Sequence, residues 1–197
     1  MVNQEKWSAA AMGAYNRLKQ GNQKYVSATR NAGDVSSELR ERLVANGQHP
    51  YACVISCADS RVVPEHIFSA GLGELFCIRV AGNVVGVEEL ASCVYAVEHL
   101  GVQLVVVLGH THCGAVGAAL AGGVDASDPL YPLVDSIVQA IGSERDADAA
   151  SVANARAGAE ALLACPALAS RVEAGNLAVV GALYRTDSGA VDFFDAR

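Results

Sequence analysis

Two short stretches of the sequence hold most of the residue types that could do chemistry: Cys57 to Arg61 and His110 to Gly114. The thiolates of Cys57 and Cys113 and the imidazole of His110 form a ligand set that zinc prefers in sulfur-rich sites. Three protein ligands leave the fourth coordination position open or exchangeable, which is the condition for catalysis rather than for a structural role. The two stretches therefore predict a catalytic zinc site with one Zn²⁺ per chain.

Asp59 and Arg61 add charged groups beside the predicted metal. Asp59 lies two residues after Cys57, on the same side of an extended segment. Its carboxylate could be a fourth ligand, or it could accept the proton of zinc-bound water. Arg61 could hold Asp59 in a bidentate ion pair and keep it ionised. The alternatives are an ordinary surface ion pair and a structural zinc cage, although such cages usually use paired Cys-x-x-Cys motifs, which the sequence lacks.

Each stretch comes at the end of an apolar segment with the pattern of a buried strand. The first segment is 51–57. The second, 104–108, is apolar throughout, as in a parallel-sheet strand that helices cover on both faces. The carboxyl ends of neighbouring parallel strands lie side by side, and ligands bind at this edge of a sheet. We therefore expect the two stretches to meet there and form one site.

The rest of the chain alternates between strand and helix patterns. Further strands are predicted at 75–80 and 177–183, with a short ending at 190–194, and a polar turn at Asn31 to Ser37. Helices are predicted at 5–25, 38–46, 87–100, 114–120, 133–142, 150–163 and 166–174. This alternation predicts an α/β fold: a mainly parallel central sheet of about four strands, closed by an edge hairpin, flanked by helices and preceded by an extended N-terminal helical arm.

Length and composition predict one globular domain. The chain has 197 residues, of which 52% are hydrophobic and 18% charged, and it is long enough to bury a real core. We expect a single domain over 1–197, made of a helical arm over 1–46 and an α/β core over 47–197.

Charge and hydropathy limit the partners and the cellular location that we expect for the chain. The net charge is −7 and no run of basic residues occurs, so we expect no nucleic-acid partner. No stretch of about 18 uncharged apolar residues occurs, so we expect no membrane span. The segment from Met1 to Lys6 lacks the pattern of a signal peptide, which favours a cytoplasmic location. There the six cysteines should be thiols or metal ligands.

Three motifs together resemble the β-class carbonic anhydrases: Cys57-x-Asp59-x-Arg61, the segment from Arg79 to Asn83, and His110-x-x-Cys113-Gly114. The similarity runs from Arg17 to Tyr184 and so covers nearly all of the chain. It implies zinc held by Cys57, His110 and Cys113, with water or Asp59 as the fourth ligand and Arg61 paired to Asp59 when water is bound.

The activity that the resemblance implies is reversible hydration of carbon dioxide to bicarbonate and a proton. Zinc-bound hydroxide, oriented by Asp59 paired with Arg61, would attack the carbon of the substrate. The chain would then be an enzyme, a carbonic anhydrase of the zinc lyase class. Hydrolysis of carbonyl sulfide or carbon disulfide at the same site, and a non-catalytic zinc-binding protein, are the alternatives. A Ser/His/Asp hydrolase is not favoured, because no Gly-x-Ser-x-Gly pattern occurs.

The resemblance also implies a substrate pocket and a partner subunit. Gln48, nine residues before the first ligand, matches a glutamine that hydrogen-bonds substrate in some family members. Phe76 and Tyr95 match aromatic residues of the small apolar pocket, where Ala81 is small and the family has an aliphatic residue. Gly114, in the second ligand motif, is also expected to bind substrate. In the family the glutamine and one or more aromatics come from the partner, so we expect a homodimer or higher oligomer with the site at the interface. Plain core packing is the alternative for the two aromatics.

Two further residue patterns concern regulation and proton transfer. One subgroup of the family is regulated by bicarbonate through a Trp, an Arg and a Tyr; Arg79 and Tyr184 occupy similar places here, but Val54 stands where the Trp is expected. The departure predicts that water rather than Asp59 occupies the fourth zinc position at neutral pH. His112, next to a ligand, is the most plausible proton shuttle among the remaining histidines, and a structural or solvated role is the alternative.

Overall fold

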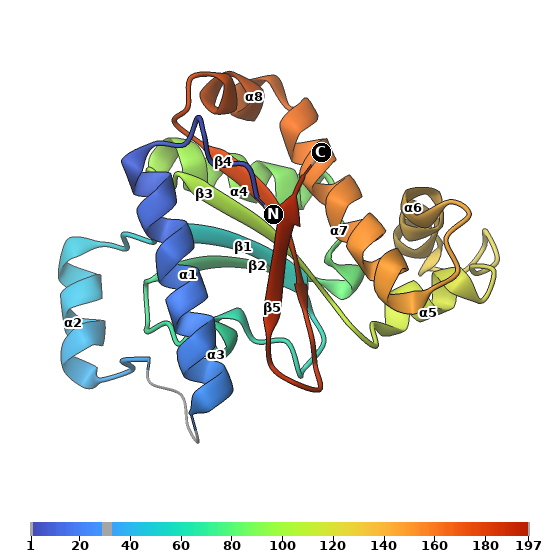
Figure 1. The fold of residues 1–197 in the computed structure, drawn as a ribbon, viewed down its shortest axis with the longest axis horizontal. Coiled ribbons are helices and arrows are strands. Elements are labelled where there is room, and N and C mark those ends of the chain that lie inside the picture. The colour runs from blue at the N-terminus through green and yellow to red at the C-terminus, as the bar shows by residue number, and fades with distance from the viewer. Residues whose placement is uncertain (1, 29–32, 197) are drawn as a thin grey trace.

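The computed structural model describes residues 2–28 and 33–196. Within these ranges the chain forms one five-stranded sheet in the order β2-β1-β3-β4-β5 (Figure 1). The strands are β1 (Ala52–Cys57), β2 (Leu75–Val80), β3 (Leu104–His110), β4 (Ala178–Tyr184) and β5 (Val191–Asp195). Strands β1 to β4 are parallel, and β5 pairs antiparallel with β4. The predicted α/β fold is confirmed, and the sheet has five strands because the C-terminal ending pairs along its full length as the edge strand.

Helices cover both faces of this sheet. They are α1 (Ala9–Ser27), α2 (Ser37–Asn46), α3 (Pro64–Ile67), α4 (Val87–His99), α5 (Gly114–Leu120), α6 (Tyr131–Ile141), α7 (Ala147–Ala164) and α8 (Pro166–Glu173), with a 3₁₀ turn η1 (Ala81–Asn83). Helix α1 starts later than its apolar spacing predicts because Ser8 caps it, accepting a hydrogen bond from Ala11 N–H. The sequence missed α3 and η1, since three or four residues are too few to show a helical period.

The buried strands send alternate side chains into two apolar layers. On one face Val54 and Val106 pack with α1 and α3, where Leu18 and Phe68 are buried. On the other face Ile55, one residue along β1, packs beneath α4, α7 and α8. Figure 1 shows α1 crossing in front of the sheet. Because both faces are covered, the functional side chains of the strands emerge only at their ends.

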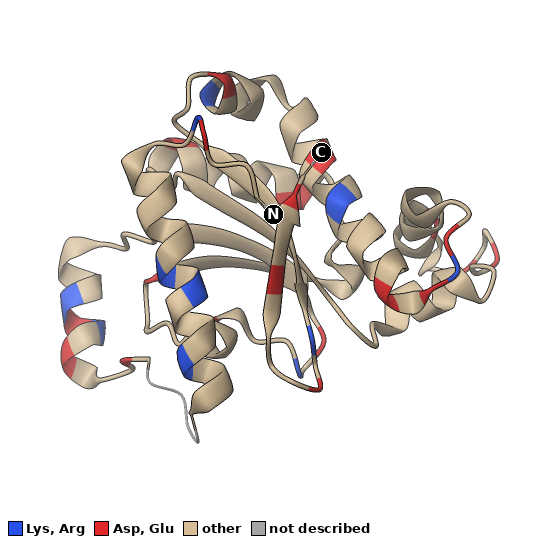
Figure 2. Cartoon of the chain, viewed as in Figure 1, with Lys and Arg blue, Asp and Glu red and all other residues tan. Residues whose placement is uncertain are grey.

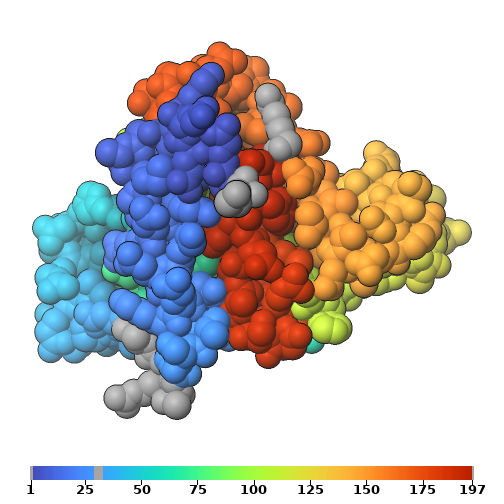
Figure 3. Space-filling model, in the orientation of Figure 1, coloured from blue at the N-terminus to red at the C-terminus, as the bar shows by residue number. Residues whose placement is uncertain are grey.

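Helices α5 and α6 form a lobe beside the carboxyl ends of β1 and β3. In the space-filling view this lobe projects from one side of the molecule, in yellow and orange (Figure 3). Its apolar residues, including Val116 and Ile137, cluster with Cys57 and Cys113. The lobe therefore covers the two cysteines that the sequence predicts as ligands, and both are nearly buried.

The N-terminal helices differ in how they contact the sheet. Helix α1 packs on it, whereas every residue of α2 is at least partly exposed, and Val44 is 89% exposed. The division into a helical arm over 1–46 and a core over 47–197 stays a prediction. Of the predicted turn at Asn31 to Ser37, the first two residues lie outside the described part of the chain.

Charged residues are scattered over the surface. Lys and Arg lie on several elements; on α2 and α8 they stand beside Glu, whereas α1 carries basic residues only (Figure 2). Among the described helices, none combines the length and the apolar character needed to cross a membrane.

Candidate metal centre

The three predicted metal ligands lie together at the carboxyl edge of the sheet. Strand β1 ends at Cys57, and the neighbouring parallel strand β3 ends at His110. Cys113 follows after one tight turn and occupies the N-cap position of α5. The two sulfurs and an imidazole nitrogen all lie within 4.8 Å of one another, and all three residues are buried. The sheet topology thus brings 57 and 110 together across 53 residues of sequence.

The His110 ring is oriented to bind a cation. Its Nδ1 lies 2.9 Å from the carbonyl oxygen of Thr111. Because a carbonyl only accepts, Nδ1 carries the proton and the lone pair is on Nε2. That Nε2 is buried and has no hydrogen-bond partner among the described residues. An unpaired buried nitrogen is costly unless something binds it, so this residue fits a metal ligand.

The two ligand thiols share a polar environment that favours ionised sulfur. Cys57 Sγ accepts hydrogen bonds from the backbone N–H of Gly82 at 3.3 Å and of Asp59 at 3.4 Å. Hydrogen bonding from the Cys113 thiol, together with these two N–H groups, lowers the pKa of Cys57 to about 4. The hydrogen bond to Cys57 and burial raise the pKa of Cys113. A bound divalent cation would ionise both thiols, and this donor set fits Zn²⁺.

Gly82 positions one of the N–H groups that face Cys57. Its φ is +66°, and a Cβ there would lie 2.6 Å from Ile137 Cδ1 and 3.0 Å from Ala115 Cβ. Its carbonyl oxygen accepts a hydrogen bond of 2.7 Å from Asn154 Nδ2 on α7. Sequence reasoning missed Asn154. Its only signal is a polar residue in an alanine-rich helix, where it is 4% exposed.

Substituting Gly82 with alanine should therefore lower the free energy of unfolding. We expect a loss of about 1–3 kcal/mol, because the left-handed backbone becomes strained for alanine and the new methyl group meets Ile137. Chemical denaturation of the purified proteins measures this loss. The matched control is Gly13→Ala in the exposed middle of α1, where a Cβ meets nothing within 4 Å and stability should rise by about 0.5–1 kcal/mol. Equal effects of the two substitutions would contradict the inference that the backbone and close contacts of Gly82 require glycine.

Asp59 and Arg61 form a bidentate ion pair beside the cluster, since the Asp59 backbone N–H faces Cys57 Sγ. Arg61 Nε donates to Asp59 Oδ1 at 3.0 Å and Nη2 donates to Oδ2 at 2.7 Å. The backbone N–H of Arg61 also donates to Oδ1 at 2.9 Å. These hydrogen bonds hold the pKa of the Asp59 carboxyl well below its usual range, so the group is ionised at neutral pH. Both carboxylate oxygens bind Arg61, and Asp59 is not part of the cluster of possible ligands.

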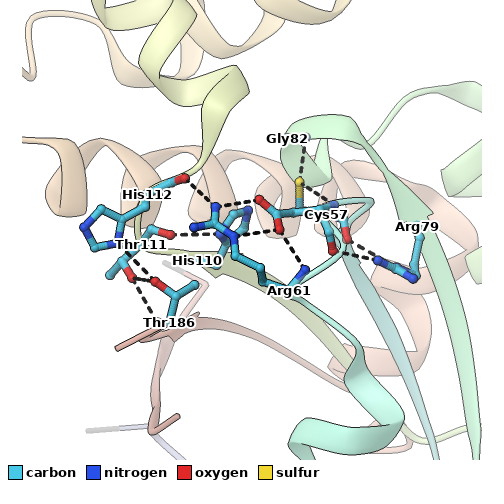
Figure 4. Close-up of polar contacts among 9 residues, drawn as sticks. Cys57, Arg61, Arg79, Gly82, His110, Thr111, His112 and Thr186 are labelled. Carbon is cyan, nitrogen blue, oxygen red and sulfur yellow. Dashed lines mark hydrogen bonds and ion pairs between the residues drawn. The ribbon is translucent and has the colours of Figure 1, made fainter. Parts of the chain in front are cut away.

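Arg79 stabilises the backbone on which these residues lie. Its Nη2 donates to the carbonyl oxygen of Asp59 at 2.8 Å, and its Nε donates to that of Cys57 at 3.3 Å (Figure 4). The other two positions that the resemblance linked to regulation by bicarbonate make different contacts from Arg79. Val54 is fully buried in β1, and the Tyr184 hydroxyl lies 3.0 Å from that of Tyr25.

The predicted substrate residues fall into two groups. Ala81 and Gly114 lie beside the cluster, since one precedes Gly82 in η1 and the other follows Cys113 as the first residue of α5. Gln48 is exposed in the segment before β1, at the opposite end of that strand from Cys57. The six residues of β1 span roughly 17 Å at about 3.3 Å per residue. Within one chain, the structure does not bring Gln48 to the cluster.

Phe76 and Tyr95 lie together, away from the ligands. Phe76 is opposite Cys53 in the β1–β2 register, four residues before the ligand at the end of β1. Its ring centroid lies 6.1 Å from that of Tyr95 on α4. Phe76 also packs against the apolar layer beneath α4, while Tyr95 remains 47% exposed.

Comparisons with known proteins agree with this geometry. The family model described as carbonic anhydrase matches residues 52–191. Carbonic anhydrase 2 of Mycobacterium tuberculosis is 38% identical over 185 residues, which cover 89% of each chain. The carbonic anhydrase of Mycolicibacterium smegmatis is 35% identical over 188 residues, covering 91% of each. The solved β-carbonic anhydrase CcaA superposes with a TM-score of 0.69 at 30% identity, covering 92% of this chain and 95% of that one. The chain therefore belongs to the β-class carbonic anhydrases and is an enzyme of that family.

Proposed function

We propose that this protein catalyses the reversible hydration of carbon dioxide to bicarbonate and a proton in a zinc-dependent reaction. Carbon dioxide hydration is the general reaction of the family to which the chain belongs. The observation that carries the proposal is the buried cluster of Cys57, His110 and Cys113, with its unpartnered His110 Nε2 beside the Asp59–Arg61 pair.

Cys57, His110 and Cys113 would hold the zinc ion. When bound, zinc would act as a Lewis acid that lowers the pKa of bound water and stabilises negative charge on oxygen. The hydrogen bond from His110 Nδ1–H to the Thr111 carbonyl keeps the ring in the tautomer that offers Nε2. The backbone N–H groups of Gly82 and Asp59 stabilise charge on the Cys57 sulfur.

Asp59 orients the attacking water. Its carboxylate is ionised, so its free lone pairs can accept a hydrogen bond from the water and direct an oxygen lone pair at the substrate carbon. Since Arg61 keeps the Asp59 pKa well below the usual range, the carboxylate is a weak final proton acceptor at neutral pH. Asp59 therefore contributes by positioning the water rather than by keeping its proton.

We infer that the fourth coordination position is left to solvent in the resting enzyme at neutral pH. The support is that both oxygens of Asp59 are held by Arg61. A crystal structure near pH 7 with the Asp59 carboxylate on the metal would contradict this inference.

We also propose a homodimer or higher oligomer in which a second copy completes the substrate pocket. Gln48 is exposed at the wrong end of β1 to reach its own cluster. Tyr95 and Val87 on α4 are 47% and 79% exposed, and β2 is an edge strand. A protein that sediments as a monomer in analytical ultracentrifugation and is fully active at the same concentration would contradict this proposal. The cytoplasmic location stays a prediction.

Stopped-flow carbon dioxide hydration, with the metal content determined on the same sample, tests the function. We expect close to one zinc per chain, fast hydration, loss of activity after removal of zinc by a chelator, and recovery when zinc is returned. One zinc per chain without hydration between about pH 7 and pH 9 would contradict the proposal. Carbonyl sulfide would then be the first substrate to test.

A further inference from the structure

Thr186 connects the turn after β4 to the two residues between the predicted ligands His110 and Cys113. Its Oγ1 lies 2.9 Å from Thr111 Oγ1 and 3.0 Å from His112 Nδ1 (Figure 4). Its backbone N–H donates to Thr111 Oγ1 at 3.0 Å. One hydroxyl group from a distant part of the sequence therefore contacts both residues of the segment that links the ligands.

The carbonyl groups of that segment orient the site. The Thr111 carbonyl accepts the Nδ1–H of His110 at 2.9 Å and so sets the direction of Nε2. The His112 carbonyl accepts a hydrogen bond of 3.1 Å from Arg61 Nη2, the same atom that donates to Asp59 Oδ2. Movement of this one segment would therefore disturb both a metal ligand and the Asp59–Arg61 pair.

Contacts from the end of β4 and from the turn after it hold this segment in shape, since the Thr111 N–H also donates to the Tyr184 carbonyl at 3.0 Å. His112 has a φ of +58°, in the left-handed region that residues other than glycine rarely occupy. A return to negative φ would turn the carbonyl of His112 away from Arg61. The imidazole is exposed, but its Nδ1 is held by Thr186, whose side chain is only half-buried. Since Thr111 is buried and contacts Thr186 through two hydrogen bonds, the turn after β4 supplies the restraint.

We propose that Thr186 is a positioning residue, whose hydroxyl fixes the Thr111–His112 segment and through its carbonyls orients both His110 and Arg61. The proposal rests on the proposed function, because His110 is taken as a zinc ligand and Arg61 as the partner of the water-orienting Asp59. It also assigns His112 to this restraint. Its ring is held at Nδ1, and its backbone carbonyl contacts Arg61 in the site.

The test compares Thr186→Val, which removes the hydroxyl at nearly constant volume, with Thr186→Ser, which keeps it. Zinc release from the loaded proteins to a chromogenic chelator is the main measurement. We expect about tenfold faster release from Thr186→Val, at the lower end of the effects of groups that orient ligands, and release close to that of the unchanged protein from Thr186→Ser. Ser188→Ala, which removes an exposed hydroxyl in the same turn, is the matched control.

Hydration kinetics give a second readout. Thr186→Val should lower kcat about five- to tenfold with KM changed less than about twofold, because orientation of the reacting groups is lost while substrate binding is retained. Zinc release equal to that of the unchanged protein, or equally fast release from the serine variant, would overturn the proposal. If the unchanged protein does not hydrate carbon dioxide, the proposed function fails, yet the comparison of zinc release still decides the role of the Thr186 hydroxyl.

Discussion

Replacing Cys113 with serine should leave the protein with far less than one zinc per chain and reduce carbon dioxide hydration by about 10³-fold or more. A serine hydroxyl does not ionise to a ligand at neutral pH, so only Cys57 and His110 would remain to hold zinc. Loss of the Lewis acid removes several kcal/mol of transition-state stabilisation, and roughly 4 kcal/mol corresponds to about 10³-fold in rate. Metal analysis and stopped-flow hydration on the same sample measure both effects.

The fold should survive this substitution, which makes the result easy to interpret. Cys113 is the N-cap residue of α5, and serine is among the residues that favour this position. Cys165 provides a matched control, because it is the N-cap of α8, is half-buried and lies outside the ligand cluster. Cys165→Ser should keep zinc and activity. A Cys113→Ser protein with full zinc content and hydration would show that Cys113 is not a ligand.

Substituting Asp59 with asparagine should lower kcat/KM by about 10²–10³-fold while the zinc content is unchanged. The amide keeps the shape of the carboxylate but loses its charge, so the charge-assisted pair with Arg61 weakens. One hydrogen-bond-accepting oxygen is also replaced by an NH₂ group, which can only donate. A misplaced water reacts more slowly, since a misplacement of about 1 Å can by itself cost about 10²-fold in rate. Stopped-flow hydration across a range of substrate concentrations gives the change.

Asp128→Asn is the control for removing one negative charge without touching the cluster. Asp128 lies in the exposed loop before α6, where its Oδ1 accepts the N–H of Leu130, and an asparagine oxygen can accept the same hydrogen bond. This variant should hydrate carbon dioxide as fast as the unchanged protein. If Asp59→Asn were equally active, Asp59 would have no part in orienting water, and the Asp59–Arg61 pair would be an ordinary ion pair.

Much of the fold and the ligand set could be predicted from local patterns. Strand β2 was predicted at its observed bounds, and β1 and β3 were found because their segments are almost entirely apolar, as in strands buried on both faces. Since parallel strands end at the same edge of a sheet, the sequence alone predicts that Cys57 and His110 lie together. Arg61 is two residues from Asp59, close enough for sequence to suggest the pair.

The residues that orient this chemistry depend on contacts across long stretches of the chain. Thr186 reaches Thr111 over 75 residues, and Asn154 reaches Gly82 over 72. Their residue types carry no mark of these roles, because a threonine in a turn or an asparagine in a helix is ordinary in sequence. Only the packing of β4 and α7 against the ligand strands brings them into place.

The substrate residues show the same division. The resemblance implied that Gln48 and Ala81 both belong to the substrate pocket. Within one chain they are separated by β1, since Gln48 lies before the strand and Ala81 lies beside its carboxyl end. By itself, the sequence determined which side chains can bind zinc and which strands carry them, because ligand chemistry and burial are local properties. The tertiary structure alone decided how those side chains are oriented, because hydrogen bonds between distant segments have no local signal.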